Sequence, residues 1–325
     1  MKAIVQDRYG TADVLEFRDV PEPAVGEDEV RIRVRAAGAG PDVWHLMTGL
    51  PMFARLMPGF RKIWGHPRGR DVAGVVDAVG VNVTHIAPGD EVMGIVEGSF
   101  AELAVGKAEL VVAKPARLSF EQAAAAPISG LTALQAIRDV AKVDVAKVKT
   151  GQRVLVIGAG GGVGTLTVQV ARAFGAHVTG VASTSKLDLV RSLGADEVID
   201  YTREELAGRW DAIVDTAGRR PLRVLRKLLT PTGTLGIVGG DGGGKWTGGF
   251  FRQILRAPIL SLVTRQRLRP VVSTENGEDL RALAELIERG DVTPLVGRTY
   301  PLVEAADAIR YLEGGHSAGK IVVTV

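Results

Sequence analysis

The feature that most constrains this chain is a glycine-rich loop between an apolar run and a helical run. Val154–Ile157 is the apolar run, and Gly158–Gly164 reads GAGGGVG before the helical residues begin. Glycines let a backbone turn sharply and approach a pyrophosphate, whose charge is stabilised by the free N–H groups of the helix N-terminus. The loop departs from GxGxxG because Ala159 holds the first position. It predicts a dinucleotide site, and a purely structural glycine turn is the alternative.

The residues around this loop predict a parallel sheet. From about Leu118 short apolar segments alternate with helical stretches, the pattern of successive βαβ units. Apolar strands of this kind belong to a sheet that is covered on both faces. We expect strands at 153–158, 177–182, 197–199, 211–216 and 234–239, with helices at 163–174, 185–193 and 219–229.

The first third of the chain has a different pattern. Val30, Ile32 and Val34 alternate with charged residues, which indicates a strand with one solvated face. Further strands are expected at 71–79, 90–96 and 100–105, and a last strand at 320–325 follows a helix at 279–288. We therefore predict an antiparallel, barrel-like domain formed by 1–118 and 276–325, with the parallel-sheet domain inserted at 119–275.

The end of the second expected strand of the parallel sheet bears on the choice of cofactor. An NAD-specific site carries Asp or Glu there for the ribose 2′-hydroxyl, but no acidic residue occurs from Thr165 to Leu187. Instead, residues 181–186 read VASTSK, whose hydroxyls and lysine suit a 2′-phosphate. We infer NADPH rather than NADH. The alternative is a serine-rich loop in which Ser185 caps a helix, and both roles can coexist.

Composition excludes several classes of site. The chain has no cysteine, so disulfides, thiolate nucleophiles and sulfur-ligated metals are excluded. It has no apolar run long enough to span a membrane and no signal-peptide pattern at its start, so we expect a soluble, cytoplasmic protein. The net charge is +3, yet 219–269 holds eleven Lys and Arg against Asp241. This stretch reads as a solvated basic face, a site for nucleic acid or an acidic partner, or a site for a phosphorylated cofactor.

Nine short segments, taken in their order and spacing, carry a family resemblance. They are AAG at 36–38, GRDVAGVV at 69–76, PGDEV at 88–92, GSFAE at 98–102, AAP at 125–127, GLTA at 130–133, SLGAD at 192–196, VIDY at 198–201 and GKIVV at 319–323. With them the chain resembles the zinc-independent, quinone-oxidoreductase-like and NADP-dependent alcohol-dehydrogenase-like branch of the medium-chain dehydrogenase/reductase superfamily, over nearly its whole length.

The resemblance implies a fold and a set of cofactor contacts. The fold would be a GroES-like β-barrel substrate domain plus a Rossmann domain with a doubly wound parallel sheet, a cleft between them, and a homodimer or larger homo-oligomer. Thr132 would contact the nicotinamide, and Gly239 and Lys320 are weaker candidates for cofactor contacts. The remaining implied contacts are Ala159, Gly160, Gly161, Gly162 and Val163 for the pyrophosphate, and Ser183, Lys186 and Tyr201 for the adenosine 2′-phosphate. Thr132 could instead begin a helix, and Tyr201 could be a half-buried aromatic.

The resemblance also bears on zinc and on the proton donor. Gly40 and Arg70 stand where zinc-dependent members carry a cysteine and a histidine ligand, so we expect no catalytic or structural zinc. His45 falls where those members have a relay histidine, and histidine can exchange protons near neutral pH. His45 could instead only pack or cap, and Asp42 is a second candidate that could equally be a turn residue. Leu103 replaces a tyrosine found in many relatives, so that phenolic donor is missing.

These features together predict an enzyme. The leading hypothesis is a zinc-independent, NADPH-dependent oxidoreductase that transfers hydride to a quinone, an enone or another carbonyl acceptor. The segment 51–60 is rich in methionine and aromatic residues, which favours a small hydrophobic substrate. The alternatives are a zinc-free NADP-dependent alcohol dehydrogenase or carbonyl reductase, and a non-catalytic NADPH-binding or RNA-binding protein on the same fold. The scarcity of aromatic residues, at 5%, argues against nucleic acid.

Overall fold

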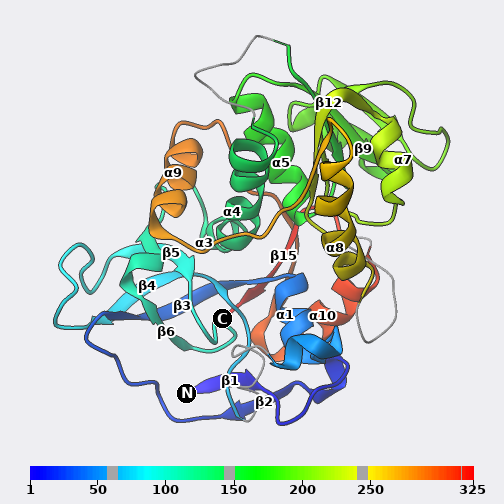
Figure 1. The fold of residues 1–325 in the computed structure, drawn as a ribbon. Helices are drawn as coiled ribbons and strands as arrows, with labels where there is room; N and C mark the ends of the chain where they lie inside the picture. The colour runs from blue at the N-terminus through cyan, green and yellow to red at the C-terminus, as the bar shows by residue number, and fades with distance from the viewer. Residues whose placement is uncertain (57–64, 143–150, 240–247, 316) are drawn as a thin grey trace. The chain divides into compact units, whose positions relative to one another are not determined.

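The chain forms two compact units. A computed structural model describes residues 1–56, 65–142, 151–239, 248–315 and 317–325. Unit 1 comprises Met1–Leu131, Glu275–Gly290 and Pro294–Val325, and unit 2 comprises Thr132–Thr274 and Asp291–Thr293 (Figure 1). Residues 119–131, which the sequence analysis placed with the parallel sheet, belong to unit 1. The units are described separately below.

Unit 2 is built on a six-stranded parallel sheet with strand order β10-β9-β8-β11-β12-β13, which confirms the predicted fold class. The order reverses direction at β8, as in a doubly wound sheet. The strands are β8 (Arg153–Ile157), β9 (His177–Ala182), β10 (Glu197–Asp200), β11 (Trp210–Asp215), β12 (Leu229–Ile237) and β13 (Arg267–Pro270). The helices are η4 (Ala136–Val140), α5 (Gly162–Ala173), η5 (Thr184–Lys186), α6 (Leu187–Ser192), α7 (Leu222–Lys227) and α8 (Gly248–Leu262).

The helices of unit 2 pack on individual strands. α5 packs on β8 and β9, α7 on β12 and α8 on β13. Trp210 is among the largest fully buried side chains of this core, and its indole nitrogen donates to Thr179 Oγ1 over 3.1 Å. The core therefore fixes β8, β9 and β12, three strands whose carboxyl ends are followed by predicted cofactor residues.

Unit 1 is built on a seven-stranded sheet with order β14-β15-β3-β4-β5-β7, in which β6 also pairs with β3. All of these pairings are antiparallel except β14 with β15, and a separate pair, β1 with β2, is antiparallel too. The last strand pairs with β3, so the tail folds back as predicted. The strands are β1 (Lys2–Val5), β2 (Glu16–Asp19), β3 (Glu29–Ala39), β4 (Asp71–Val79), β5 (Glu91–Ile95), β6 (Leu103–Lys107), β7 (Val111–Ala113), β14 (Val296–Pro301) and β15 (Lys320–Thr324).

The helices of unit 1 are short and mostly connect strands. α4 (Pro127–Gln135) begins in unit 1 and ends in unit 2. The 3-10 helices are η1 (Ala12–Val14), η2 (Met52–Leu56), η3 (Ala108–Leu110) and η6 (Leu302–Glu304), and the α-helices are α1 (Pro41–Thr48), α3 (Phe120–Ala124), α9 (Gly277–Glu288) and α10 (Ala305–Glu313). Of the methionine-rich segment, 52–56 forms η2 and 57–60 lie outside the described residues. No helix in the described ranges is long and apolar enough to cross a membrane.

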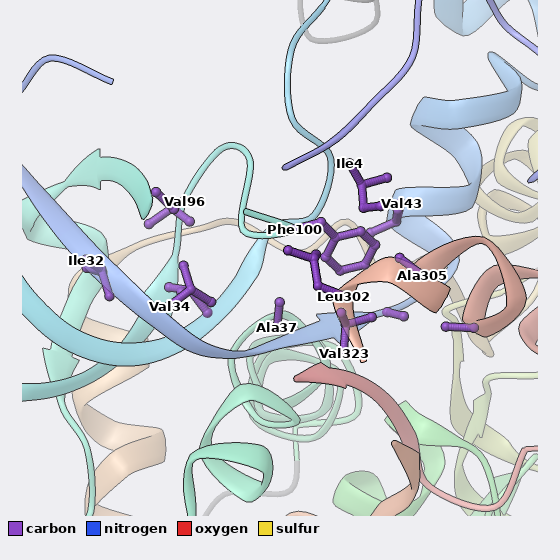
Figure 2. Packing of buried hydrophobic residues seen from close by; sticks show 14 of the residues in the cluster. Ile4, Ile32, Val34, Ala37, Val43, Val96, Phe100, Leu302, Ala305 and Val323 are labelled. Atoms are coloured by element: carbon purple, nitrogen blue, oxygen red, sulfur yellow. The ribbon is translucent and has the colours of Figure 1, made fainter. Parts of the chain in front are cut away.

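The core of unit 1 fixes the position of α1. Figure 2 shows the Phe100 ring between Ile4, Val43 and Leu302, and Phe100 is fully buried in this cluster. Val43 and Met47 are the buried side chains with which α1 joins the core. Burying residues of this size contributes roughly 1.5–3 kcal/mol each. The hydrophobic core thereby orients the helix that carries Asp42 and His45.

Candidate functional site

The glycine loop of unit 2 turns from β8 into α5 as the sequence predicts. Gly158 has φ +82°, a left-handed conformation that favours glycine, and Gly158 N and Ala159 N both donate to Val181 O. Gly161 is the N-cap of α5 and has no side chain to cap it, and the first turn of α5 carries no acidic residue. The N–H groups at this helix end and their positive dipole therefore suit an anion.

Two glycines of the loop have different surroundings, which tests whether a pyrophosphate fits. A Cβ on Gly164 would lie 2.0 Å from Gly158 O, so glycine is required there for packing of the helix against the loop. A Cβ on Gly161 would meet only Gly158 O, at 3.5 Å, and the φ of Gly161 is −91°. Neither packing nor backbone conformation therefore requires glycine at Gly161. The open space above it fits a bound pyrophosphate.

The residues predicted to bind the 2′-phosphate lie together. Tyr201 N donates to Ala182 O over 3.2 Å, which places Tyr201 beside the end of β9, and Lys186 N donates to Ser183 O over 2.9 Å. The Lys186 side chain crosses the glycine loop, since a Cβ on Gly160 would lie 2.7 Å from Lys186 Cδ. Burial lowers the pKa of Lys186. Tyr201 is half exposed, and the Arg220 guanidinium lies 6.0 Å from its ring centre.

An acidic residue beside this cluster escaped the sequence analysis. Asp200 ends β10, and its buried carboxylate accepts hydrogen bonds from Thr184 Oγ1, Thr202 N and Thr202 Oγ1. The hydrogen bond from Thr184 is the main cause that lowers the pKa of Asp200, and those from Thr202 lower it further. Its charge is stabilised inside the protein, and it fastens η5 to β10. Its position directly after the expected strand 197–199 is the signal in the sequence that could have identified it.

Thr132 and Gly239 complete the predicted residues of unit 2. Thr132 lies buried within α4, not at its start. A Cβ on Gly239 would lie 2.4 Å from Thr216 O, so glycine allows the chain after β12 to approach the chain after β11. Because β8, β11 and β12 are parallel neighbours, Gly239 and the glycine loop lie at the same carboxyl edge of the sheet.

Unit 1 holds Asp42, His45 and Lys320. His45 is exposed on α1, its Nδ1 lies 2.7 Å from Leu50 O, and its ring meets that of Trp44 edge-on at 4.9 Å. Asp42 lies in the first turn of α1, and its Oδ2 is buried with no hydrogen-bond partner among the described residues. A donor from a bound molecule would satisfy this oxygen.

Lys320 is buried, and its ammonium contacts Asp71 Oδ2 at 2.8 Å and Ser129 Oγ at 3.1 Å. These contacts of Lys320 all lie within unit 1, whereas the glycine loop belongs to unit 2. The contact with Ser129 is a hydrogen bond and the contact with Asp71 is an ion pair.

The positions matched to zinc ligands carry other groups. Arg70 donates to both carboxylate oxygens of Glu275, at 2.8 and 2.7 Å. Burial opposes the charge of Arg70, but Glu275 outweighs it and the pKa of Arg70 is raised. Gly40 has no side chain to offer a metal. Among the described residues, no three His, Asp or Glu side chains are arranged to hold a metal ion.

Comparisons with known proteins agree with this geometry. Residues 26–116 match the family described as alcohol dehydrogenase GroES-like domain, and 193–323 match the family described as zinc-binding dehydrogenase. The mouse mitochondrial NAD(P)H oxidoreductase RTN4IP1 is 34% identical over all of this chain and 89% of its own length. A chloroplastic NADPH-dependent alkenal/one oxidoreductase from Arabidopsis thaliana is 34% identical over 99% of this chain and 79% of its own. The solved quinone oxidoreductase of Coxiella burnetii superposes with a TM-score of 0.84 at 29% identity, covering 100% of this chain and 99% of its own.

Proposed function

Because the chain belongs to the quinone-oxidoreductase-like branch of the medium-chain dehydrogenase/reductase superfamily, we propose that it is a zinc-independent oxidoreductase that uses NADPH to reduce a quinone, an enone or another small hydrophobic carbonyl acceptor. The observation that carries the proposal is the open space at Gly161, together with the Lys186 side chain that lies against the neighbouring Gly160. The names of the relatives favour NAD(P)H chemistry, and the Ser183–Lys186–Tyr201 cluster favours the phosphorylated nucleotide.

The residues that would hold the cofactor divide by chemistry. The backbone from Ala159 to Val163 would bind the pyrophosphate, and Ser183, Lys186 and Tyr201 would bind the 2′-phosphate by charge-assisted and neutral hydrogen bonds. Thr132 and Gly239 would lie at the nicotinamide end. When bound, the nicotinamide supplies the hydride, and the protein orients it and excludes water.

The chain must also supply or conduct a proton. In His45, Nδ1–H donates to the Leu50 carbonyl, because a carbonyl oxygen can only accept, and this leaves Nε2 to exchange a proton. Asp42 lies on the same helix, three residues earlier, with a buried oxygen that has no described partner. We propose His45 as the proton donor and Asp42 as the second candidate.

Zinc independence is part of the proposal and rests on the ligands present. The chain has no cysteine, Gly40 offers no donor atom, and Arg70 is engaged by Glu275. Polarisation of an acceptor oxygen would then depend on hydrogen-bond donors of the protein. A chelator is expected to leave the turnover rate unchanged.

Calorimetric titration of NADPH and NADH, followed by NADPH oxidation with a small quinone or enone, tests the proposal. Loss of a charge-assisted hydrogen bond costs about 1.5–3 kcal/mol, so Lys186→Ala should weaken NADPH by roughly 10- to 100-fold and leave NADH unchanged. Lys227→Ala is the matched control, because Lys227 is an exposed lysine of the same unit. If neither nucleotide binds, the proposal fails. If NADPH binds but neither acceptor is reduced while an alcohol reduces NADP, the alcohol dehydrogenase alternative replaces it. Sedimentation of the same protein tests the homodimer that we propose from the family.

A further inference from the structure

Unit 1 contains a buried ion pair that the proposed chemistry does not use. Asp71 begins β4 and Lys320 begins β15, and these two strands flank β3 on either side. The Asp71 side chain is 0% exposed and the Lys320 side chain 5%, with Lys320 Nζ 2.8 Å from Asp71 Oδ2. The pair therefore reaches across β3.

Two glycines make room for this crossing: Gly38 in β3, and Gly40, which directly follows β3 in extended conformation. Residues two apart on a strand face the same side. A Cβ on Gly38 would lie 2.7 Å from Asp71 Oδ2, and a Cβ on Gly40 would lie 2.9 Å from Lys320 Nζ. Any larger residue at either position would displace the pair. The glycines at the end of β3 are thus matched to the two charged side chains.

The pair holds the first turn of α4. Asp71 Oδ1 accepts a 2.7 Å hydrogen bond from Ile128 N, one of the donors that a helix leaves unsatisfied at its start. Lys320 Nζ donates to Ser129 Oγ over 3.1 Å. The negative charge of Asp71 also favours the positive end of the helix dipole. The next turn of the same helix carries Thr132, the proposed nicotinamide contact.

The pair also contacts the start of α1. The Cβ position of Gly40 lies between Lys320 Nζ, at 2.9 Å, and Asp42 Oδ1, at 2.4 Å. The Gly40–Asp42 turn therefore lies directly against the ammonium group. Burial opposes the charged form of Lys320, but Asp71 and Asp42 together outweigh it and the pKa of Lys320 is raised. The two carboxylates therefore favour the cationic form of Lys320, whereas burial raises the pKa of Asp71.

A gain in folding stability does not explain why a buried ion pair stands at this place. Removing two charges from water opposes folding, and replacing a buried ion pair by apolar residues of similar volume is often neutral or stabilising. What apolar residues cannot supply is the set of directed contacts to Ile128 N, Ser129 Oγ and the turn before α1. The pair's contribution is therefore geometric.

We propose that Lys320 and Asp71 are positioning residues for the reaction: they hold the first turn of α4 and the Gly40–Asp42 turn in fixed places. Through the turn they set the position of Asp42 and His45, and at α4 they fix the start of the helix that continues to Thr132. This inference rests on the proposed function for its kinetic consequence. Its structural content, a fixed first turn of α4, does not depend on that function.

The test compares Lys320→Met with the double variant Asp71→Leu/Lys320→Met. The single change leaves Asp71 buried without its cation and is expected to destabilise the fold, whereas the double change removes both charges and restores stability. Both variants should lower kcat by about tenfold or more, because small misplacements of reacting groups are costly, while the Kd of NADPH changes by less than about threefold. Lys114→Met is the matched control, since the Lys114 side chain is also 5% exposed and pairs with Glu91 elsewhere in unit 1.

Hydrogen exchange at the Ile128 amide gives a readout that does not require turnover. Loss of its acceptor should speed exchange there by about tenfold in the double variant and leave the Lys114→Met protein unchanged. Unchanged exchange at Ile128 would overturn the positioning role, whatever the activity. Recovery of kcat together with stability in the double variant would make the pair a packing feature. A raised Kd for NADPH with unchanged kcat would make Lys320 a cofactor ligand. If the parent protein neither binds NADPH nor reduces an acceptor, the proposed function fails, and exchange at Ile128 still decides the positioning role.

Discussion

Gly161 and Gly164 stand three residues apart in the loop that opens α5, yet the structure requires glycine only at Gly164. At Gly164 the neighbouring carbonyl of Gly158 leaves no room for a side chain. At Gly161 the described residues leave the space open, and we propose that the pyrophosphate occupies it. The two positions therefore allow a glycine needed for folding to be distinguished from one proposed for binding.

Alanine substitutions should therefore have opposite profiles. Gly164→Ala should lower the free energy of unfolding by about 1–3 kcal/mol, because its methyl group would overlap Gly158 O. Gly161→Ala should change stability by less than about 0.5 kcal/mol but weaken NADPH by about tenfold or more, since its methyl group enters the pyrophosphate space. Urea denaturation and calorimetry measure the two quantities. Undiminished nucleotide affinity in Gly161→Ala would show that the pyrophosphate lies elsewhere.

The charge of Lys186 should give nucleotide preference a pH dependence. Burial lowers the pKa of Lys186 below its ordinary value of 10.5, so the side chain loses its proton at a lower pH than an exposed lysine does. Above that pKa the neutral amine no longer pairs with a 2′-phosphate. The ratio of NADPH to NADH affinity should therefore decline as the pH rises, and the decline should begin at a lower pH than the titration of an exposed lysine. Lys186→Arg stays charged over this rise in pH and should keep the ratio constant. A ratio that is equally flat in the parent protein would remove Lys186 from the phosphate site.

At the scale of elements, the sequence predicted most strands of the parallel sheet because each is a short apolar run. The expected strand 177–182 has the bounds of β9, and 153–158 and 211–216 each differ from β8 and β11 by one residue at one or both ends. β12 begins at Leu229, five residues before the expected start, because Thr230–Gly233 contains proline and glycine and resembles a turn. β13 was missed, since arginine alternates with apolar residues in its four positions and its stability comes from β12 and α8.

Some parts of the candidate site depend on neighbouring residues in the sequence, and others depend on residues far apart in the chain. The glycine loop and the Ser183–Lys186 segment could be predicted, because their chemistry is contained in a few consecutive residues. The pairing of Asp71 with Lys320 could not, since 249 positions separate them in the chain and neither residue has a local signal for burial. Asp200 is an intermediate case, because its position after a strand was visible but its partner Thr184 lies on a different element.

At the scale of the whole molecule, the chain has a separate hydrophobic core in each unit. One core is built around β3, α1 and α10 of unit 1, and the other around β8, β11 and β12 of unit 2. The proposed phosphate contacts all belong to unit 2, while the proposed proton donors belong to unit 1. A ligand that binds through one unit stabilises that unit against local opening, to an extent set by its concentration relative to its Kd.

Hydrogen exchange with and without NADPH should reveal this division. At 100 times its Kd, NADPH stabilises the state it binds by about 2.7 kcal/mol, so amides that exchange by local opening of the site should slow by up to roughly 100-fold. We expect the largest slowing from Gly158 to Val163 and from Ser183 to Lys186, and none in the β1–β2 pair of unit 1. NADH at the same saturation should protect the first segment but less of the second, because it lacks the 2′-phosphate. Equal slowing across both units would mean that these amides exchange through one cooperative opening of the chain. Slowing confined to unit 1 would contradict the assignment of the cofactor to the glycine loop.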